Sequence, residues 1–362
     1  MQKPEAKVAT FRRAWFLALF CMVLMMAWSA PALAQKEHKH RRGQENASAD
    51  EKAHKHKDKG EKAPSVADLW NDPGDIKGRD LFDGPGGKEH EPHGPMTFVE
   101  EDTKGSNPKF DLKDGNGETW KAKVGVEAQP ETAAVRLLWA VGYFADDDYF
   151  LPQLQVKGMP QLKRGGNVAD PNGTVRNVRL KYRAAKKEGT WKWDHNPFTG
   201  TREMNGLRVM MALVNNWDLK DENNAIYKEK DDGRRIYLVS DVGASFGRTG
   251  YHYYGGWSKN DAAAYAHSKF ISHIHKDSVD FNEPTHPPFI YVFGLIRWAR
   301  HLHERGTTKH IPRADAKWIG GLLAQLTPEQ INDAFRAAGY NDAQIAVLAG
   351  ALRDRIAQLN RL

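Results

Sequence analysis

Alternating hydrophobic and polar positions predict three short strands in succession, beginning just after Met96. They span residues 97–101, 109–112 and 119–124. The second and third are joined by the sequence Asp114-Gly115-Asn116-Gly117, which is typical of a tight hairpin turn. This part of the chain is therefore predicted to begin as an antiparallel sheet.

The pattern then changes to a helical period. Hydrophobic residues recur at i, i+3, i+4 and i+7 between residues 130 and 141, and Pro130 suits the first helical position. The apolar stripe consists of Ala134, Leu137, Leu138 and Val141. Two further strands are predicted at 149–156 and 175–182. The predicted order is β-β-β-α-β-β.

The second half of the chain is predicted to be mainly helical. Helices are expected at 203–214, 262–274 and 289–300, and two short strands at 225–228 and 235–239 flank the turn Asp231-Asp232-Gly233. Two later helices carry capping-box signals. In the first, Thr327 and Gln330 form the box and Pro328 stands at the first helical position; in the second, Asn341 and Gln344 form the box.

The N-terminus has the pattern of an export signal. Arg12 and Arg13 precede an apolar run from Ala14 to Trp28, and Ala32-Leu33-Ala34 offers a small-residue cleavage site. The run is shorter than the approximately 20 apolar residues of a typical membrane-spanning helix. Residues 1–34 are therefore predicted to be a cleaved signal peptide, with an uncleaved anchor as the alternative, and the protein to be periplasmic or secreted with no stable membrane span.

Composition limits the chemistry of the mature chain. Its only cysteine, Cys21, lies in the signal segment, so thiol catalysis and disulfides are excluded after cleavage. The 362 residues are 40% hydrophobic, enough for a two-lobed domain. The net charge of +7 is modest and much of it sits near the N-terminus, so nucleic acid is not an expected partner.

Two polar segments precede the predicted domain. Residues 35–63 are almost all charged or small, and they are predicted to be a disordered basic linker. Its two His-x-His pairs, His38 with His40 and His54 with His56, could catch metal, although a solvated linker is the simpler interpretation. Residues 64–95 are rich in Gly and Pro and are predicted to form a partly ordered arm.

The strongest chemical signal is a polar loop after the helix that ends near Asn215. Asp218 is followed five residues later by Asn223, and Asp241 with Gly243 stands at the end of the hairpin that follows. Amide and carboxylate oxygens are ligands that suit Mg²⁺, so Asn223 and Asp241 are predicted metal ligands. Asp218 could orient an attacking hydroxyl, and Lys220 could balance the charge of a transferring phosphoryl group. Taken alone, the loop is more simply interpreted as a polar turn formed by Asp and Asn.

A lysine on a strand and a glutamate on a helix complete the candidate site. Glu131 falls on the apolar stripe of the predicted helix, where an unpaired carboxylate would be costly, so a buried cationic partner is expected. Lys123 is the first choice and Lys121, which shares its strand face, is the second. Glu127 is a weaker candidate for the glutamate. The alternative is that Glu131 only interacts with the helix dipole.

Other candidates are weaker. The turn Lys104-Gly105-Ser106 could cover nucleotide phosphates with backbone N–H groups, but it lacks a full Gly-x-Gly-x-x-Gly pattern. Trp191 and Trp193 could form a wall of a nucleotide site, although packing of a linker is simpler. The histidines His267, His273 and His275 show no convincing metal spacing on the predicted helix.

The Asn-x-Asp opening of the loop resembles the atypical kinases of the HipA, CotH spore-coat and Golgi secretory-pathway type. The resemblance covers roughly residues 96–247. It implies an α+β, two-lobed kinase-like fold with a β-rich N-lobe at 96–185, a helical C-lobe at 186–362, and ATP and Mg²⁺ between them. It assigns Asp218 the catalytic role, Asn223 and Asp241 the metal roles, and Lys123 and Glu131 the ion pair.

The sequence also departs from ordinary protein kinases. There is no Phe after Asp241, no Arg before Asp218 and no Ala-Pro-Glu segment, so control by activation-loop phosphorylation is not expected. An exported phosphotransferase acting on an unknown protein or small molecule is the favoured function. A non-catalytic kinase-fold scaffold is the alternative, because ATP is expected to be scarce outside the cytoplasm. An unrelated periplasmic binding protein with a chance motif is the third hypothesis.

Overall fold

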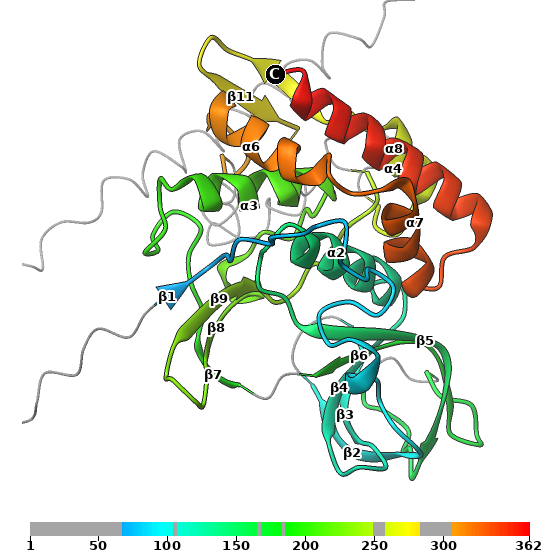
Figure 1. Ribbon diagram of the computed structural model, residues 1–362. Coiled ribbons are helices and arrows are strands. Elements are labelled where there is room, and N and C mark those ends of the chain that lie inside the picture. Colours follow the sequence, from blue (N-terminus) through cyan, green and yellow to red (C-terminus); the bar gives the residue numbers. More distant parts are fainter. Residues whose placement is uncertain (1–66, 104–106, 165–167, 183–184, 249–257, 283–305) are drawn as a thin grey trace, which may run out of the picture. The chain divides into compact units, whose positions relative to one another are not determined.

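The protein combines a barrel of strands with a mainly helical half (Figure 1). The computed structural model describes residues 67–103, 107–164, 168–182, 185–248, 258–282 and 306–362, which all belong to one unit running from Lys62 to Leu362. Within these residues there are six α-helices and several sheets. The fold is therefore mixed α and β, as the sequence predicted in outline.

Five strands close into a barrel in the order β2-β3-β4-β6-β5. The strands are β2 (Met96–Asp102), β3 (Lys109–Lys113), β4 (Thr119–Val124), β5 (Asp147–Lys157) and β6 (Thr174–Tyr182). Alternate residues fill the interior, including Phe110, Leu112, Trp120, Val178 and Leu180. All five predicted strands are confirmed, together with their order around the helix.

Helix α2 (Ala128–Ala140) is inserted between β4 and β5. It lies between the barrel and the helices of the second half (Figure 1). It is buried on nearly every side, because barrel strands cover one face and helices cover the other. It begins at Ala128, so Pro130 is the third helical residue rather than the first.

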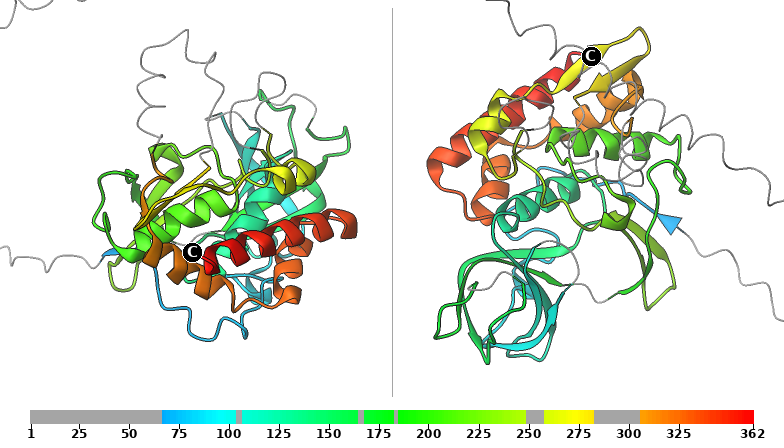
Figure 2. Two further views of the ribbon diagram at one scale, coloured as in Figure 1. Left: turned by 90° about the horizontal axis from the view of Figure 1, so that it is seen from above. Right: turned by 180° about the vertical axis from the view of Figure 1, so that it is seen from behind.

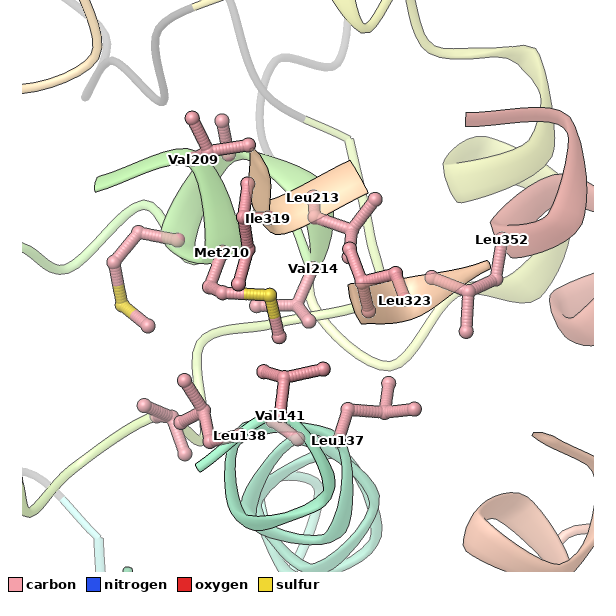
Figure 3. Close-up of a cluster of buried hydrophobic side chains, with 14 of the residues drawn as sticks. Leu137, Leu138, Val141, Val209, Met210, Leu213, Val214, Ile319, Leu323 and Leu352 are labelled. Atoms are coloured by element: carbon pink, nitrogen blue, oxygen red, sulfur yellow. The ribbon is translucent and has the colours of Figure 1, made fainter. Parts of the chain in front are cut away.

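The main core lies where α2 meets the helices that follow. Leu137, Leu138 and Val141 point toward residues of α3 (Arg202–Leu213) and α6 (Arg313–Leu323), as Figure 3 shows. Dense apolar packing at this junction fixes α2 against the second half, and with it the start of the helix that carries Glu131.

Two further helices complete this half (Figure 2). They are α7 (Pro328–Ala337) and α8 (Asp342–Asn360), and both begin with the predicted capping boxes. The Thr327 and Asn341 side chains each accept a hydrogen bond from the backbone N–H three residues on, and Gln330 and Gln344 reciprocate. These reciprocal bonds satisfy backbone donors that would otherwise lack partners.

The predicted hairpin before Asp241 is also confirmed. Strands β8 (Asn224–Lys228) and β9 (Arg235–Val239) pair antiparallel, and β9 ends two residues before Asp241. The hairpin is the centre of a four-stranded sheet with β7 (Lys186–Gly189) and β1 (Ala67–Asp68) at its edges. A short 3₁₀ turn, η2 (Asp221–Asn223), leads directly into β8.

The helix predicted at 262–274 is wrong in its second half. Helix α4 covers only Ala262–His267, and β10 (Ile271–Ile274) follows it. Strand β10 pairs with β11 (Ser278–Phe281), which pairs with β12 (Ile311–Pro312). The segment forms a strand because these neighbours supply the hydrogen bonds, a tertiary effect that local periodicity does not reveal. The helix predicted at 289–300 lies outside the described residues.

Packed structure begins before Met96, where the sequence predicted the first strand. Leu69, Ile76 and Leu81 are buried in the main core. The Gln330 side chain on α7 donates hydrogen bonds to the carbonyl oxygens of Ile76 and Arg79. A 3₁₀ turn, η1, spans Lys88–His90. This Gly- and Pro-rich segment therefore packs against the rest of the protein through both apolar and polar contacts.

The predicted signal peptide (1–34) and basic linker (35–63), with its histidine pairs, lie outside the described residues. Within the described part of the chain, no helix has both the length and the hydropathy needed to cross a membrane.

Candidate active site

A cavity of about 250 Å³ lies beside the barrel strands, the η2 turn and the end of β9. Charged and polar side chains dominate its wall. The lining residues are Asp102, Lys109, Phe110, Asp111, Lys121, Ala122, Lys123, Glu131, Arg179, Lys181, Lys187, Glu222, Asn223, Tyr227, Ser240 and Asp241. Four predicted site residues, Lys123, Glu131, Asn223 and Asp241, are therefore brought to one cavity from separate parts of the chain.

Lys123 is the centre of the charge network. It is 1% exposed, and its Nζ lies 2.6 Å from Glu131, 2.9 Å from Asp241 and 3.2 Å from Glu127. Burial alone would lower the pKa of Lys123, but the neighbouring carboxylates outweigh burial and the pKa is raised. The ion pair expected between Lys123 and Glu131 is present, and Glu127 shares the lysine.

Three cations stand side by side across the barrel wall. Lys109 on β3, Lys123 on β4 and Arg179 on β6 are paired in register. Like charges directly opposite one another on adjacent strands repel. Their nearest counter-charges are Glu131 from α2 and Asp241 from the end of β9. The barrel therefore presents a concentrated positive row, which protein carboxylates neutralise.

Glu131 binds more partners than the sequence suggested. It is fully buried, and its Oε1 lies 3.0 Å from Arg179 and 3.5 Å from Lys181, both on β6. Burial would raise the pKa of Glu131, but Arg179 and Lys123 outweigh that effect, so the pKa is lowered and the group stays ionised. Sequence reasoning missed Arg179 and Lys181, although their spacing of two places both on one strand face.

A second layer of acids stands behind these cations. Lys181 Nζ lies 2.7 Å from Asp146, and Arg179 Nε lies 3.8 Å from Asp148 on β5. Asp148 is fully buried, and burial raises its pKa to about 7 despite the nearby Arg179. Arg179 and Lys181 are thus held from both sides, which fixes where Glu131 can sit.

Asp241 is held against Lys123, and Gly243, two residues later, lacks a side chain where α2 comes close. The Asp241 carboxylate also lies 4.0 Å from Lys109 Nζ. Burial opposes ionisation of Asp241, but the charge and hydrogen bond of Lys123 hold its pKa well below the usual range. A Cβ atom at Gly243 would lie 2.8 Å from the Glu127 side chain. Gly243 therefore allows α2 to begin close to Asp241.

The polar loop is locked to the Asp241 segment through Asn223. The Asn223 carbonyl oxygen accepts hydrogen bonds from the backbone N–H groups of Ser240 and Asp241, at 2.8 and 3.2 Å. Its side-chain amide nitrogen donates to the Asp218 carbonyl oxygen at 2.7 Å. With the amide nitrogen engaged, the side-chain oxygen is the atom of Asn223 that could ligate a cation.

Asp218 and Lys220 form a pair of their own. Asp218 Oδ1 lies 2.7 Å from Lys220 Nζ, and the Asp218 backbone N–H donates to the Asn216 side chain. Neither Asp218 nor Lys220 is among the residues that line the cavity. The loop thus places Asp218 next to the Asn223 ligand candidate but outside the cavity wall.

The remaining candidates fall into three groups. Lys104, Gly105 and Ser106 lie outside the described residues. Trp191 and Trp193 are buried and do not line the cavity, and Trp191 Nε1 donates to the Leu238 carbonyl, so they pack the chain as the simpler interpretation held. Lys121 lies on the cavity wall but is 64% exposed and pairs with Asp111 at 3.0 Å.

Comparisons with known proteins give few matches. No protein-family model matches the chain, and neither does any curated protein. Among solved structures, the chain is similar to the crystal structure of a Helicobacter pylori proinflammatory kinase, CtkA, with 10% sequence identity and a TM-score of 0.42. The match covers 73% of this chain and 96% of that chain. What can be said of the site therefore comes from its own geometry.

Proposed function

We propose that the protein is a kinase-like phosphotransferase that moves the terminal phosphoryl group of ATP to an acceptor hydroxyl with the help of Mg²⁺. The observation that carries the proposal is the convergence of Lys123, Glu131, Asn223 and Asp241 on one cavity. A strand lysine paired with a helix glutamate, beside Asp and Asn oxygen ligands, is the arrangement with which protein kinases carry out phosphoryl transfer.

In this proposal the domain has two lobes with the cavity between them. The N-lobe is the barrel with α2, at residues 96–185, and the C-lobe is the mainly helical part at 186–362. The cavity wall supports this division, because its residues come from barrel strands on one side and from η2, β8 and the Asp241 segment on the other.

The charges of the cavity fit a nucleotide polyphosphate. The row of Lys109, Lys123 and Arg179 can bind phosphate oxygens, and oxygen ligands from Asp241 and Asn223 suit Mg²⁺. Mg²⁺ would neutralise charge that develops on the transferring group. Lys123 holds Asp241 before nucleotide binds, so that binding requires the lysine to turn from a carboxylate to a phosphate.

Asp218 is assigned the role of binding the acceptor hydroxyl. Its carboxylate pairs with Lys220, and its main chain is held by Asn216 and Asn223, so the group has a fixed position beside the proposed metal ligand. In this role Asp218 orients the hydroxyl and accepts its proton as the phosphoryl group transfers. The acceptor can be a protein or a small molecule.

Asp241→Asn is expected to remove the Mg²⁺-dependent part of ATP binding, because the change deletes a charged metal ligand. The measurement is the rise in melting temperature with ATP alone and with Mg-ATP, compared within each variant. Asp111→Asn is the matched control, since Asp111 lines the same cavity but is no proposed ligand. An equal Mg²⁺ effect in Asp241→Asn and wild type would refute the metal assignment.

A non-catalytic nucleotide-binding protein is the second candidate. The observation that favours it is that Asp218 lies outside the cavity wall, while Lys123 is already satisfied by three carboxylates. Purified protein incubated with radiolabelled ATP and candidate acceptors separates the two functions. Stabilisation by Mg-ATP without any transfer would favour the binding protein, and transfer would establish the enzyme.

Export is part of the proposal and has its own test. The basic start, apolar run and Ala32-Leu33-Ala34 ending support cleavage after Ala34. N-terminal sequencing of protein from the secreted or periplasmic fraction is expected to begin at Gln35. An intact Met1 in that fraction would contradict cleavage.

A further inference from the structure

A cluster of two histidines and one aspartate lies at the small sheet β10-β11-β12, apart from the cavity. His275 follows β10, Asp280 lies on β11, and His310 immediately precedes β12. None of the three lines the cavity. One side chain thus comes from β11 and one from the end of each neighbouring strand, at positions as much as 35 residues apart in the sequence (310 minus 275).

The three side chains lie close enough for their ligand atoms to reach one ion. His275 Nε2 lies 3.2 Å from Asp280 Oδ2, and His310 Nδ1 lies 3.6 Å from Asp280 Oδ1. One ligand atom from each residue can be chosen so that all three lie within 4.8 Å of one another. With zinc–ligand bonds of about 2.0–2.1 Å, tetrahedral geometry places neighbouring ligand atoms about 3.3 Å apart.

The main chain around the cluster is held by hydrogen bonds. The His310 N–H donates to Asp280 Oδ1 at 2.7 Å, and the His275 N–H donates to the Ser278 carbonyl at 2.9 Å. His310 has a φ of 51°, a left-handed conformation that non-glycine residues seldom adopt. Lys309 Nζ donates to the Phe281 carbonyl oxygen at 2.9 Å and so ties the segment before β12 to the end of β11.

We propose that His275, Asp280 and His310 bind one Zn²⁺ ion, with water in the fourth position. Two imidazoles and one carboxylate, with water in the fourth position, form a ligand set found in zinc sites and unlike the all-oxygen sets of Mg²⁺ and Ca²⁺. The side chains of His275 and His310 are 38% and 77% exposed, so an ion can reach them from solvent.

The ion would cross-link neighbouring parts of the chain. It would join the β10–β11 hairpin to the start of β12, and through β12 to α6, which begins at the next residue, Arg313. Because the three ligands come together only in the folded chain, zinc binding would stabilise the fold and leave the cavity chemistry unchanged.

The test uses the full chain with His38, His40, His54 and His56 replaced by alanine, because any metal bound by these His-x-His pairs would add background. Metal-stripped protein is titrated with Zn²⁺ and followed by calorimetry and melting temperature. One ion per chain and a Zn²⁺-dependent rise in melting temperature are expected. Co²⁺ in place of Zn²⁺ is expected to give the intense visible absorption of a tetrahedral site.

Variants assign the ligands. Asp280→Asn and His310→Ala are each expected to weaken zinc binding by roughly 10- to 100-fold or more. Loss of an outer-shell partner already costs that much, and these two residues are the proposed ligands themselves. His267→Ala, an exposed histidine on α4, is the matched control and should bind zinc as the parent does. His273→Ala should also retain binding, although its ring centroid lies 4.4 Å from that of His275.

Two results would overturn the proposal. One is unchanged affinity and stoichiometry in both Asp280→Asn and His310→Ala. The other is loss of binding in His273→Ala with full binding in His310→Ala, which would place the ion elsewhere on the hairpin. Since His310 is exposed, its variant should melt close to the parent without metal, so a folding defect can be distinguished from a lost ligand.

Discussion

Replacing Asp218 with asparagine is expected to lower the rate of phosphoryl transfer by about 10²–10⁴-fold, the usual contribution of a general base. ATP binding should remain within a few-fold of wild type, because Asp218 does not line the cavity. Asparagine preserves the shape of the side chain, and the hydrogen bonds to the Asp218 main chain do not depend on its carboxylate. The measurements are the rate of transfer from radiolabelled ATP and the Mg-ATP melting shift.

The matched control for this change is Asp231→Asn. Asp231 is an exposed aspartate at the tip of the β8–β9 hairpin, and its replacement removes the same charge without touching the loop. Its rate should equal that of wild type. Transfer that persists at the wild-type rate in Asp218→Asn would remove the catalytic role from Asp218. A fall in ATP binding equal to the fall in rate would instead place Asp218 in the nucleotide site.

The sequence predicted the five strands of the barrel and the β8–β9 hairpin because their patterns are local, but it did not predict that the five strands close into a barrel. Strands β3 and β4 alternate apolar and polar residues, β9 is a short apolar run, and Asp114-Gly115 and Asp232-Gly233 mark the hairpin turns. The capping boxes at Thr327 and Asn341 were predictable for the same reason, since both partners lie within one helical turn. Such signals need no knowledge of the rest of the fold.

The errors arise where distant partners decide the structure. Residues 271–274 form a strand only because β11 pairs with them, and β11 in turn pairs with β12 from beyond residue 305. Strand β1 consists of two residues that pair with β9 about 168 positions later (235 minus 67). No local period distinguishes such short strands from loops, so β1 and the sheet of β10, β11 and β12 could not be predicted.

The candidate site was predictable to the extent that burial imposes a partner on a charge. Glu131 on an apolar stripe required a cation, and Lys123 supplies it. That Arg179 and Lys181 would share Glu131 depends on β6 lying beside β4, which is decided by the order of the strands in the barrel rather than by any local pattern. The contact between Lys123 and Asp241 joins residues 118 positions apart, and no spacing rule reaches so far.

The order of the barrel strands also places three cations side by side, which the sequence did not show. Lys109, Lys123 and Arg179 repel one another across three strands, and the protein neutralises them with Glu131 and Asp241. A row of cations assembled at this expense is more consistent with binding an anion than with stability alone. The hypothesis of a polyphosphate ligand rests on this row as much as on the loop motif.

Lys123→Met is therefore expected to have large effects on both stability and nucleotide binding. It removes the cation shared by Glu131, Glu127 and Asp241, and breaking one side of a buried ion pair typically costs about 3–5 kcal/mol of unfolding free energy. Loss of a charged hydrogen bond to phosphate, worth about 1.5–3 kcal/mol, should weaken ATP binding by roughly 10- to 100-fold. Denaturant unfolding and calorimetry measure the two quantities.

Lys121→Met is the matched control, since Lys121 shares the strand face but is exposed and pairs with Asp111. It should unfold with nearly wild-type free energy. ATP binding that weakens more in Lys121→Met than in Lys123→Met would transfer the nucleotide role to Lys121, which the sequence left as the second choice.

The stability lost in Lys123→Met should also depend on pH. In the wild type, Lys123 lowers the pKa of Asp241 below its unfolded value, so the stabilisation is present above that value, near pH 4, and is lost as pH falls through the folded pKa. Without Lys123 the pKa of Asp241 should rise. The difference in unfolding free energy between variant and wild type should therefore be largest near pH 7 and shrink as the pH falls below about 4, the unfolded value of an aspartate. A difference that stays constant from pH 7 to well below pH 4 would show that Lys123 stabilises the site by packing rather than by charge.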